Sequence, residues 1–137
     1  MNTWQTFIFA GGAALSLAAS LPARADTVSG NDLFSGCTAN NDPSQLNFCA
    51  GYIIGAVEGM KVGLAWPMML AGDHKPIEEI NKAVETLLQI CAPPEVEYGQ
   101  YVGVVVKYLG DHPENRHNSA RMLIINALQR AFPCVEK

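Results

Sequence analysis

The stretch DPSQLNFCAGYIIGAVEGMKVGLAWP, residues 42–67, decides the fold. Asp42 is a good N-cap residue, and Pro43 suits the first helical position, where a backbone N–H is not needed. Apolar residues then recur every three or four positions, which predicts a helix that ends near Trp66, because Pro67 cannot easily continue it. The apolar stripe consists of Leu46, Cys49, Ile53, Val57, Met60 and Leu64.

The same predicted helix carries a glycine at every fourth position, namely Gly51, Gly55, Gly59 and Gly63. In a helix interior each glycine costs about 1 kcal/mol relative to alanine, so some contact must offset them. A flat row of this kind admits a second helix at close range. Packing within the domain is the favoured interpretation, and a homodimer contact is the alternative. Glu58 and Lys61 on the same helix argue against membrane-type pairing.

Three further helices are predicted downstream, and no sustained strand alternation is present. They span about residues 76–91, 97–109 and 113–132. Ile77 and Leu87 belong to the apolar stripe of the first of these, and Tyr98 to that of the second. Because the connections are short, we expect an all-α fold, a small disulfide-stabilised four-helix bundle with up-down-up-down topology.

All four cysteines lie beyond residue 25, at Cys37, Cys49, Cys91 and Cys134. An even number in an exported chain predicts two disulfides, with three possible connectivities. In the predicted bundle Cys49 and Cys91 lie at the base of the first hairpin, and Cys37 and Cys134 at the two ends of the domain. This arrangement favours the pairs Cys49–Cys91 and Cys37–Cys134. A zinc site is disfavoured because the chain has no C-x-x-C pair.

Residues 1–25 have the pattern of a cleaved secretory signal peptide. The uncharged apolar run from Phe7 to Ser20 precedes Ala23-Arg24-Ala25, an A-x-A cleavage signal. An uncleaved anchor is the alternative, for which the run is short. Cleavage after Ala25 would leave one domain, residues 26–137, in the periplasm. Loss of Arg24 leaves eight basic residues against thirteen acidic ones, a net charge of −5, which disfavours nucleic acid and membrane surfaces as partners.

The segment HPENRH, residues 112–117, holds two of the three histidines. Glu114 and His117 have the Glu-x-x-His spacing that can place two metal ligands on one helical face. The chain has no second pair of this kind, and a transition-metal site needs three or four ligands. Pro113 instead suits the first position of a helix. We therefore predict a helix start here, and neither a metal site nor a cofactor.

The connection between the first two predicted helices, residues 66–74, is unusually apolar. Tryptophan and methionine are enriched at binding surfaces. We interpret this segment as a loop that contacts a partner. The candidate contact residues are Trp66, Met68, Met69, Leu70, Asp73 and His74. The alternative is that the loop folds back and caps the end of the bundle.

Four blocks in separated parts of the chain form a longer pattern. They are Cys49-x-Gly51-Tyr52-Ile53-x-Gly55, Cys91-x-Pro93, Val104 to Leu109 with His112-Pro113-Glu114, and Ala127-Leu128-x-x-Ala131-Phe132-Pro133-Cys134. In this order they resemble the Rap/Tai family of type VI secretion immunity proteins, over nearly the whole domain. One departure is Glu97, where a threonine-like N-cap is expected, although Gln100 preserves half of a capping box.

The resemblance implies a small, helical, disulfide-bonded periplasmic protein that is not an enzyme. Such proteins bind a cognate peptidoglycan-cleaving amidase effector and obstruct its active site, often as homodimers. The residues themselves offer no G-x-S-x-G elbow, and paired cysteines leave no thiolate, so no catalytic residue is predicted. Two other classes stay open: an acid-stress chaperone of the HdeA type, which would expose apolar surface at low pH, and a small periplasmic hydrolase.

Overall fold

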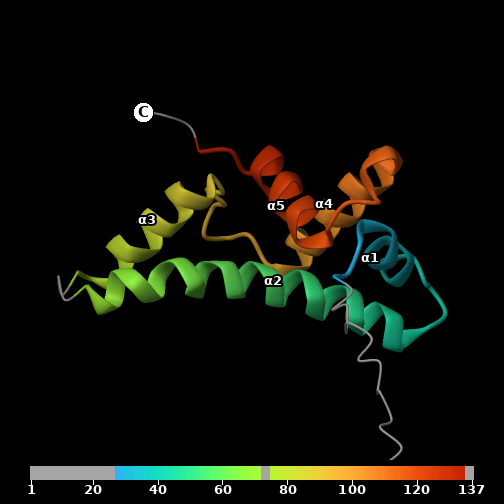
Figure 1. The fold of residues 1–137 in the computed structure, drawn as a ribbon, viewed down its shortest axis with the longest axis horizontal. Coiled ribbons are helices and arrows are strands. Elements are labelled where there is room, and N and C mark those ends of the chain that lie inside the picture. The colour runs from blue at the N-terminus through green and yellow to red at the C-terminus, as the bar shows by residue number, and fades with distance from the viewer. Residues whose placement is uncertain (1–26, 72–74, 135–137) are drawn as a thin grey trace, which may run out of the picture.

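The computed structural model describes residues 27–71 and 75–134, and within these ranges the chain is all-helical (Figure 1). Its elements are α1 (Gly30–Cys37), α2 (Pro43–Leu70), α3 (Ile77–Leu88), α4 (Tyr98–Asp111), the short 3-10 helix η1 (Pro113–Asn115) and α5 (Ala120–Ala131). The all-α prediction is confirmed, but the up-down-up-down arrangement is not. Helix α2 instead forms a long base, with α1, α4 and α5 on its N-terminal part and α3 alone along its C-terminal part.

Helix α2 begins where the sequence predicts. The Asp42 carboxylate accepts hydrogen bonds from the backbone N–H groups of Ser44 and Gln45, at 2.9 and 3.3 Å. The predicted end at Trp66 is wrong, because the helix continues through Pro67 to Leu70. Proline lacks a backbone N–H, so it removes one hydrogen bond of the helix. The hydrogen bonding continues beyond it, because the Ala71 N–H donates to the Pro67 carbonyl at 3.1 Å.

The hydrophobic core lies between α1, α4, α5 and the N-terminal part of α2. Its members are buried side chains contributed by all of these helices and by the segment after α3. They are Leu33, Cys49, Ile53, Val57, Ile90, Tyr101, Val105, Tyr108, Leu109, Ala120, Leu123, Ile124, Ala127 and Leu128. Four helices therefore share one core, and α3 lies outside it.

Helix α1 was not predicted. Ser29 caps it, and a capping box forms because the Asp32 carboxylate accepts from the Ser29 backbone N–H at 2.9 Å. Leu33 is fully buried in the core. A short helix of eight residues with one anchoring side chain gives too weak a periodic pattern to be read from sequence.

The start of α1 also explains why the predicted helix 113–132 is wrong in its first turns. The backbone N–H of Gly30 donates to the Asn118 carbonyl at 2.9 Å, and that of Asn31 donates to the Arg116 carbonyl at 2.8 Å. In the opposite direction, the Ala120 N–H donates to the Val28 carbonyl at 2.9 Å. The backbone that would have continued a helix from Pro113 is therefore bonded to α1, and α5 begins only at Ala120. A Cβ at Gly30 would lie 2.9 Å from the Arg116 carbonyl oxygen, so only glycine fits this crossing.

Helices α3 and α4 agree with their predicted positions to within a few residues. Helix α3 ends at Leu88 because Gln89 adopts a left-handed conformation, with φ of 57°. Glu97 precedes α4, and the Gln100 side chain accepts from the Glu97 backbone N–H at 2.8 Å. The half of a capping box expected from the sequence is thus present.

The predicted disulfide pairing is wrong. The structure pairs Cys37 with Cys49 and Cys91 with Cys134. Because α1 is a helix that packs on the start of α2, it brings Cys37 to Cys49 and cannot reach the C-terminal end of the domain.

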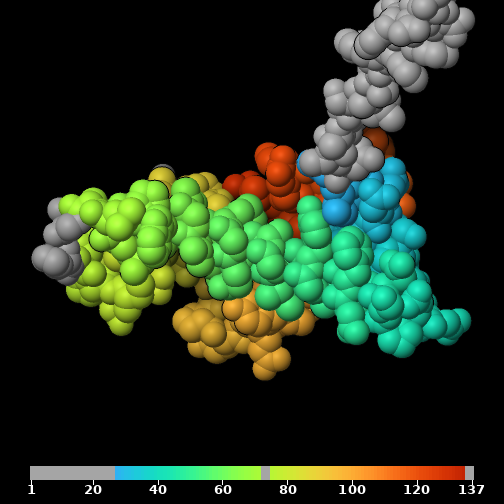
Figure 2. Space-filling view, turned by 60° about the horizontal axis from the view of Figure 1, so that its bottom comes forward, coloured from blue at the N-terminus to red at the C-terminus, as the bar shows by residue number. Residues whose placement is uncertain are grey.

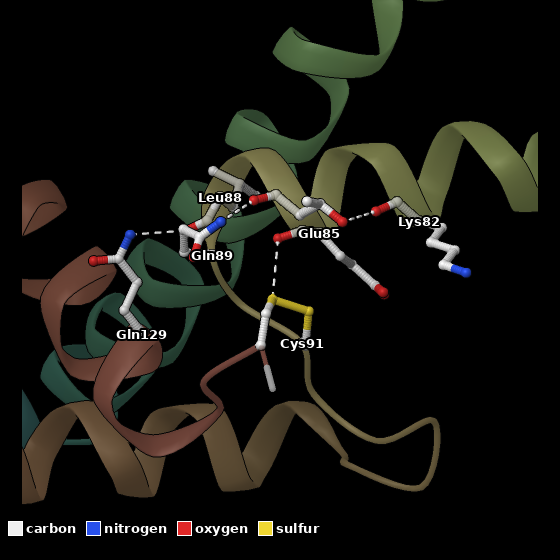
Figure 3. Close-up of a disulfide and its surroundings, with 8 residues drawn as sticks. Lys82, Glu85, Leu88, Gln89, Cys91 and Gln129 are labelled. Atoms are coloured by element: carbon white, nitrogen blue, oxygen red, sulfur yellow. Dashed lines mark hydrogen bonds between the residues drawn. A yellow bond between two sulfur atoms is a disulfide. The ribbon is translucent and has the colours of Figure 1, made fainter. Parts of the chain in front are cut away.

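Around the second disulfide, the end of α3 is held to the end of α5 (Figure 3). The Gln129 amide donates to the Leu88 carbonyl at 2.8 Å, and the Cys91 N–H donates to the Phe132 carbonyl at 2.8 Å. These bonds and the disulfide tie α3 to the body of the protein, where Leu88 at the end of α3 packs against the edge of the core.

We expect the two disulfides to stabilise the protein unequally. They enclose sequence separations of 12 and 43 residues, for which the chain-entropy model gives about 3 and about 4 kcal/mol. Urea unfolding of Cys37→Ala/Cys49→Ala and Cys91→Ala/Cys134→Ala should therefore show the larger loss of unfolding free energy for the second pair. A larger loss for the first pair would contradict this.

Candidate functional site

Helix α2 buries very little of its own surface. Of its 28 residues only Cys49, Ile53 and Val57 are buried. By length and composition alone the helix could cross a membrane, yet only 17% of its most apolar window is buried within the protein. A large apolar surface that the protein itself leaves uncovered marks an interaction site.

The C-terminal part of α2, from Val62 to Leu70, projects from the body together with α3, and we call these two segments the arm (Figure 1). Large apolar side chains on the arm are half or more exposed. They are Val62 (59%), Trp66 (56%), Met69 (52%), Leu70 (69%), Ile77 (50%) and Leu87 (59%). Between α2 and α3 runs an open groove of about 400 Å³, which also reaches Tyr98 at the start of α4.

Charged groups lie along one side of this α2–α3 groove. Lys61 Nζ lies 3.5 Å from Glu58 Oε1 and 5.9 Å from the centre of the Tyr101 ring. The Glu58 carboxylate accepts a hydrogen bond from the Tyr98 hydroxyl and raises the pKa of Tyr98. Glu85 lines the groove from α3. The groove therefore offers apolar walls with an acidic edge, and its chemistry suits recognition of a protein segment.

A second groove, of about 520 Å³, lies between α2 and α5. It is lined by Gly51, Tyr52, Gly55, Ala56, Gly59 and Met60 of α2 and by Arg121, Met122 and Ile125 of α5. A Cβ at any of the four α2 glycines, Gly63 included, would meet nothing within 4 Å. Among the described residues no helix therefore packs closely on this row, and Figure 2 shows α2 running uncovered across the front of the molecule. The homodimer alternative stays a prediction.

The structure places the predicted contact residues on helical turns, not in a loop. Trp66, Met69 and Leu70 are exposed at the end of α2. Met68 is half-buried and lines two small pockets against α3. Asp73 and His74 lie outside the described residues. The alternative in which the segment folds back over the bundle is wrong for residues 66–70, because they extend α2 away from the body.

Four exposed residues of the arm and its groove differ from the sequence prediction. Ile77 and Tyr98, expected in apolar stripes that face the core, are 50% and 47% exposed on the rim of the α2–α3 groove. Leu87, expected in the same stripe as Ile77, is 59% exposed. Val62 lies one turn before Trp66 and is not among the predicted contact residues. Its position four residues from Trp66 was a usable signal, since residues four apart share a helical face.

HPENRH forms a small surface cluster. His112 Nδ1 lies 3.1 Å from Glu114 Oε1, and Arg130 Nη1 lies 3.4 Å from His112 Nε2. Within residues 27–71 and 75–134, no three His, Cys, Asp or Glu side chains come together as a possible metal site. The cluster instead closes the turn between α4 and η1.

Comparison with known proteins decides the family. A family model of Rap1a immunity proteins matches residues 29–134, which is most of the chain. The chain belongs to the Rap1a immunity protein family. Neither the curated proteins nor the solved structures gave a match. Membership confirms the immunity-protein resemblance seen in the cysteine and glycine blocks, and it implies that the function is to bind a partner effector.

Three carboxyl groups have pKa values below their ordinary range, each because of a neighbouring donor. The Ser29 hydroxyl and backbone lower the pKa of Asp32, and the Lys107 ammonium, with Nζ 2.7 Å away, lowers that of Asp111. A backbone N–H, and then His112, lower the pKa of Glu114. All three groups stabilise the folded chain in their ionised form.

This gives the stability a defined pH dependence. Because the folded pKa of Asp32 lies below its ordinary value of 3.8, its contribution is present above that value and is lost as the pH falls towards the folded pKa. Asp32→Asn should therefore lower the urea midpoint at about pH 7, and the difference from the wild type should shrink as the pH falls below about 4. A gap that is constant across this range would contradict the assignment.

Proposed function

We propose that this protein is a periplasmic immunity protein that binds a cognate peptidoglycan amidase effector of type VI secretion, occludes its active site, and acts as a homodimer. The observation that carries the proposal is the exposed apolar arm of a chain that belongs to an immunity family. Membership of an immunity family favours this function over an acid-stress chaperone or a hydrolase.

The arm is suited to enter a cleft. It is narrow, since it consists of two antiparallel helical segments, and its end presents Met69 and Leu70. Two elements limit its motion: α3 packs along α2, and the Cys91–Cys134 disulfide holds the far end of α3. A binding element that is ordered before association loses less entropy on binding than a flexible loop.

Charge would assist the encounter. The mature domain has a net charge of −5 if residues 1–25 are removed. An enzyme that works on an anionic cell wall benefits from a basic surface, and opposite charges accelerate association. Export by the N-terminal signal sequence, with cleavage after Ala25, would place the protein where peptidoglycan is exposed.

Binding is tested with the oxidised protein, residues 26–137, and the peptidoglycan amidase encoded beside its gene. We expect tight binding and loss of cell-wall digestion. Met69→Ser/Leu70→Ser should weaken binding by roughly 10- to 100-fold, as truncation of central apolar contacts does. Met122→Ser on α5 is the matched control, because Met122 is 51% exposed against 52% for Met69.

If Met69→Ser/Leu70→Ser and Met122→Ser weakened binding equally, the arm would not be the contact surface. If no amidase encoded beside the gene is bound or inhibited, the amidase proposal fails, while the family assignment stands on its own observation.

A further inference from the structure

The groove between α2 and α5, which we call the α2–α5 groove, differs in chemistry from the α2–α3 groove. Of its nine lining residues eight are uncharged, and Arg121 of α5 is the exception. The α2–α3 groove has Glu58, Lys61 and Glu85 among its lining residues. Protein interfaces surround their apolar centre with a polar rim, whereas sites for small ligands are mostly apolar and contain few polar groups. The α2–α5 groove therefore has the composition of a small-ligand site.

The α2–α5 groove follows the axis of α2. Gly51, Gly55 and Gly59 line it from α2, and they share one helical face because they lie four residues apart. An added Cβ at any of them would meet nothing within 4 Å, so a ligand atom can approach the helix backbone there. Met122 and Ile125 line the groove from α5. The span from Gly51 to Gly59 is about 12 Å at 1.5 Å per residue, which suits an extended hydrocarbon chain.

Arg121 gives this groove a single positive charge. The residue is exposed at the start of α5, where the helix dipole adds to the positive potential. Lys61, Lys75 and Lys107 each lie between 2.7 and 3.6 Å from a carboxylate oxygen. Within residues 27–71 and 75–134, by contrast, no salt bridge engages Arg121. Its guanidinium is therefore available to an anionic group, and it can bind a carboxylate through two parallel hydrogen bonds.

We propose that the α2–α5 groove binds a fatty acid. The hydrocarbon chain lies along the glycine side of α2, and the carboxylate pairs with Arg121. The volume of about 520 Å³ falls within the range of small-ligand sites, about 300–1,000 Å³. Burial of the chain supplies the affinity, and the single cation selects a charged head group over a neutral one. The proposal rests on this groove and does not depend on the immunity function.

The charge of the protein favours a free fatty acid over the surface of a membrane. The chain has a net charge of −4, which an anionic membrane surface repels. Proteins that bind such surfaces present clusters of roughly four to eight lysines and arginines, whereas Arg121 is the one cation that lines this groove among the described residues. A single cation suits a single carboxylate.

The ligand class is tested by isothermal titration of the oxidised protein, produced from its full-length sequence, with dodecanoate below its critical micelle concentration. We expect binding with one-to-one stoichiometry. Arg121→Gln should raise the dissociation constant roughly tenfold or more, because the carboxylate loses its charged partner. Arg130→Gln is the matched control and should bind as the wild type does, because it removes the same charge from the same helix at a position that does not line the groove.

The position of the ligand is tested with Gly55→Leu, whose side chain would fill the groove. This variant should lose dodecanoate binding, whereas Gly103→Leu on α4, away from the groove, should keep it. An added Cβ at either position has nothing within 4 Å, so both variants should fold, and circular dichroism measures their helicity. If folded Gly55→Leu bound dodecanoate as the wild type does, the groove would not be the site.

Two further ligands separate a fatty acid from other apolar partners. Dodecanol, which has the same chain without the charge, should bind to the wild type roughly tenfold more weakly than dodecanoate. Equal binding of the two, or unchanged dodecanoate binding by Arg121→Gln, would overturn the role of the head group. Vesicles of phosphatidylglycerol should not sediment with the protein, and co-sedimentation would assign the apolar surface to a membrane instead. If the wild type bound no dodecanoate, this proposal would fail, while the immunity proposal is tested separately by amidase inhibition.

Discussion

The burial of Cys49, Ile53 and Val57 is the contact on which the rest of the structure depends. These three side chains attach a 28-residue helix to its core, and at 1.5 Å per residue that helix is about 42 Å long. They lie within its first 15 residues, so the core supports only the N-terminal part. The other part must project, and its apolar surface must meet α3 or a partner.

The disulfides follow from this geometry. Cys37–Cys49 fixes α1 to the supported part of α2, close to the core. The second disulfide, Cys91–Cys134, joins the segment that follows α3 to the segment that follows α5. The Gln129 side chain of α5 also donates a hydrogen bond to the Leu88 carbonyl at the end of α3. This disulfide, the hydrogen bonds around it and the buried side chains Ile80 and Val84 of α3 together hold α3 against α2.

Local signals predicted much of this structure, and long-range contacts account for the errors. The Asp42-Pro43 cap, the α4 bounds and the all-helical class can be predicted because each depends on neighbouring residues. The cysteine pairing could not be, because it depends on α1, whose eight residues are ordered by Leu33 in the core and by bonds to residues 116–120. The apolar character of residues 66–70 was visible in the sequence. Their helical form and the groove shared with Ile77 and Tyr98 were not, since these arise from the packing of α3 on α2.

The α2 glycines join the fold to the function. Four glycines in a helix interior cost about 4 kcal/mol relative to alanine, a large fraction of the stability of a small domain. Among residues 27–71 and 75–134 no contact offsets that cost, because an added Cβ at each position would meet no neighbour within 4 Å. Packing within the described part of the chain therefore does not explain the glycines, and their open row leaves room for a partner to approach the backbone of α2 closely.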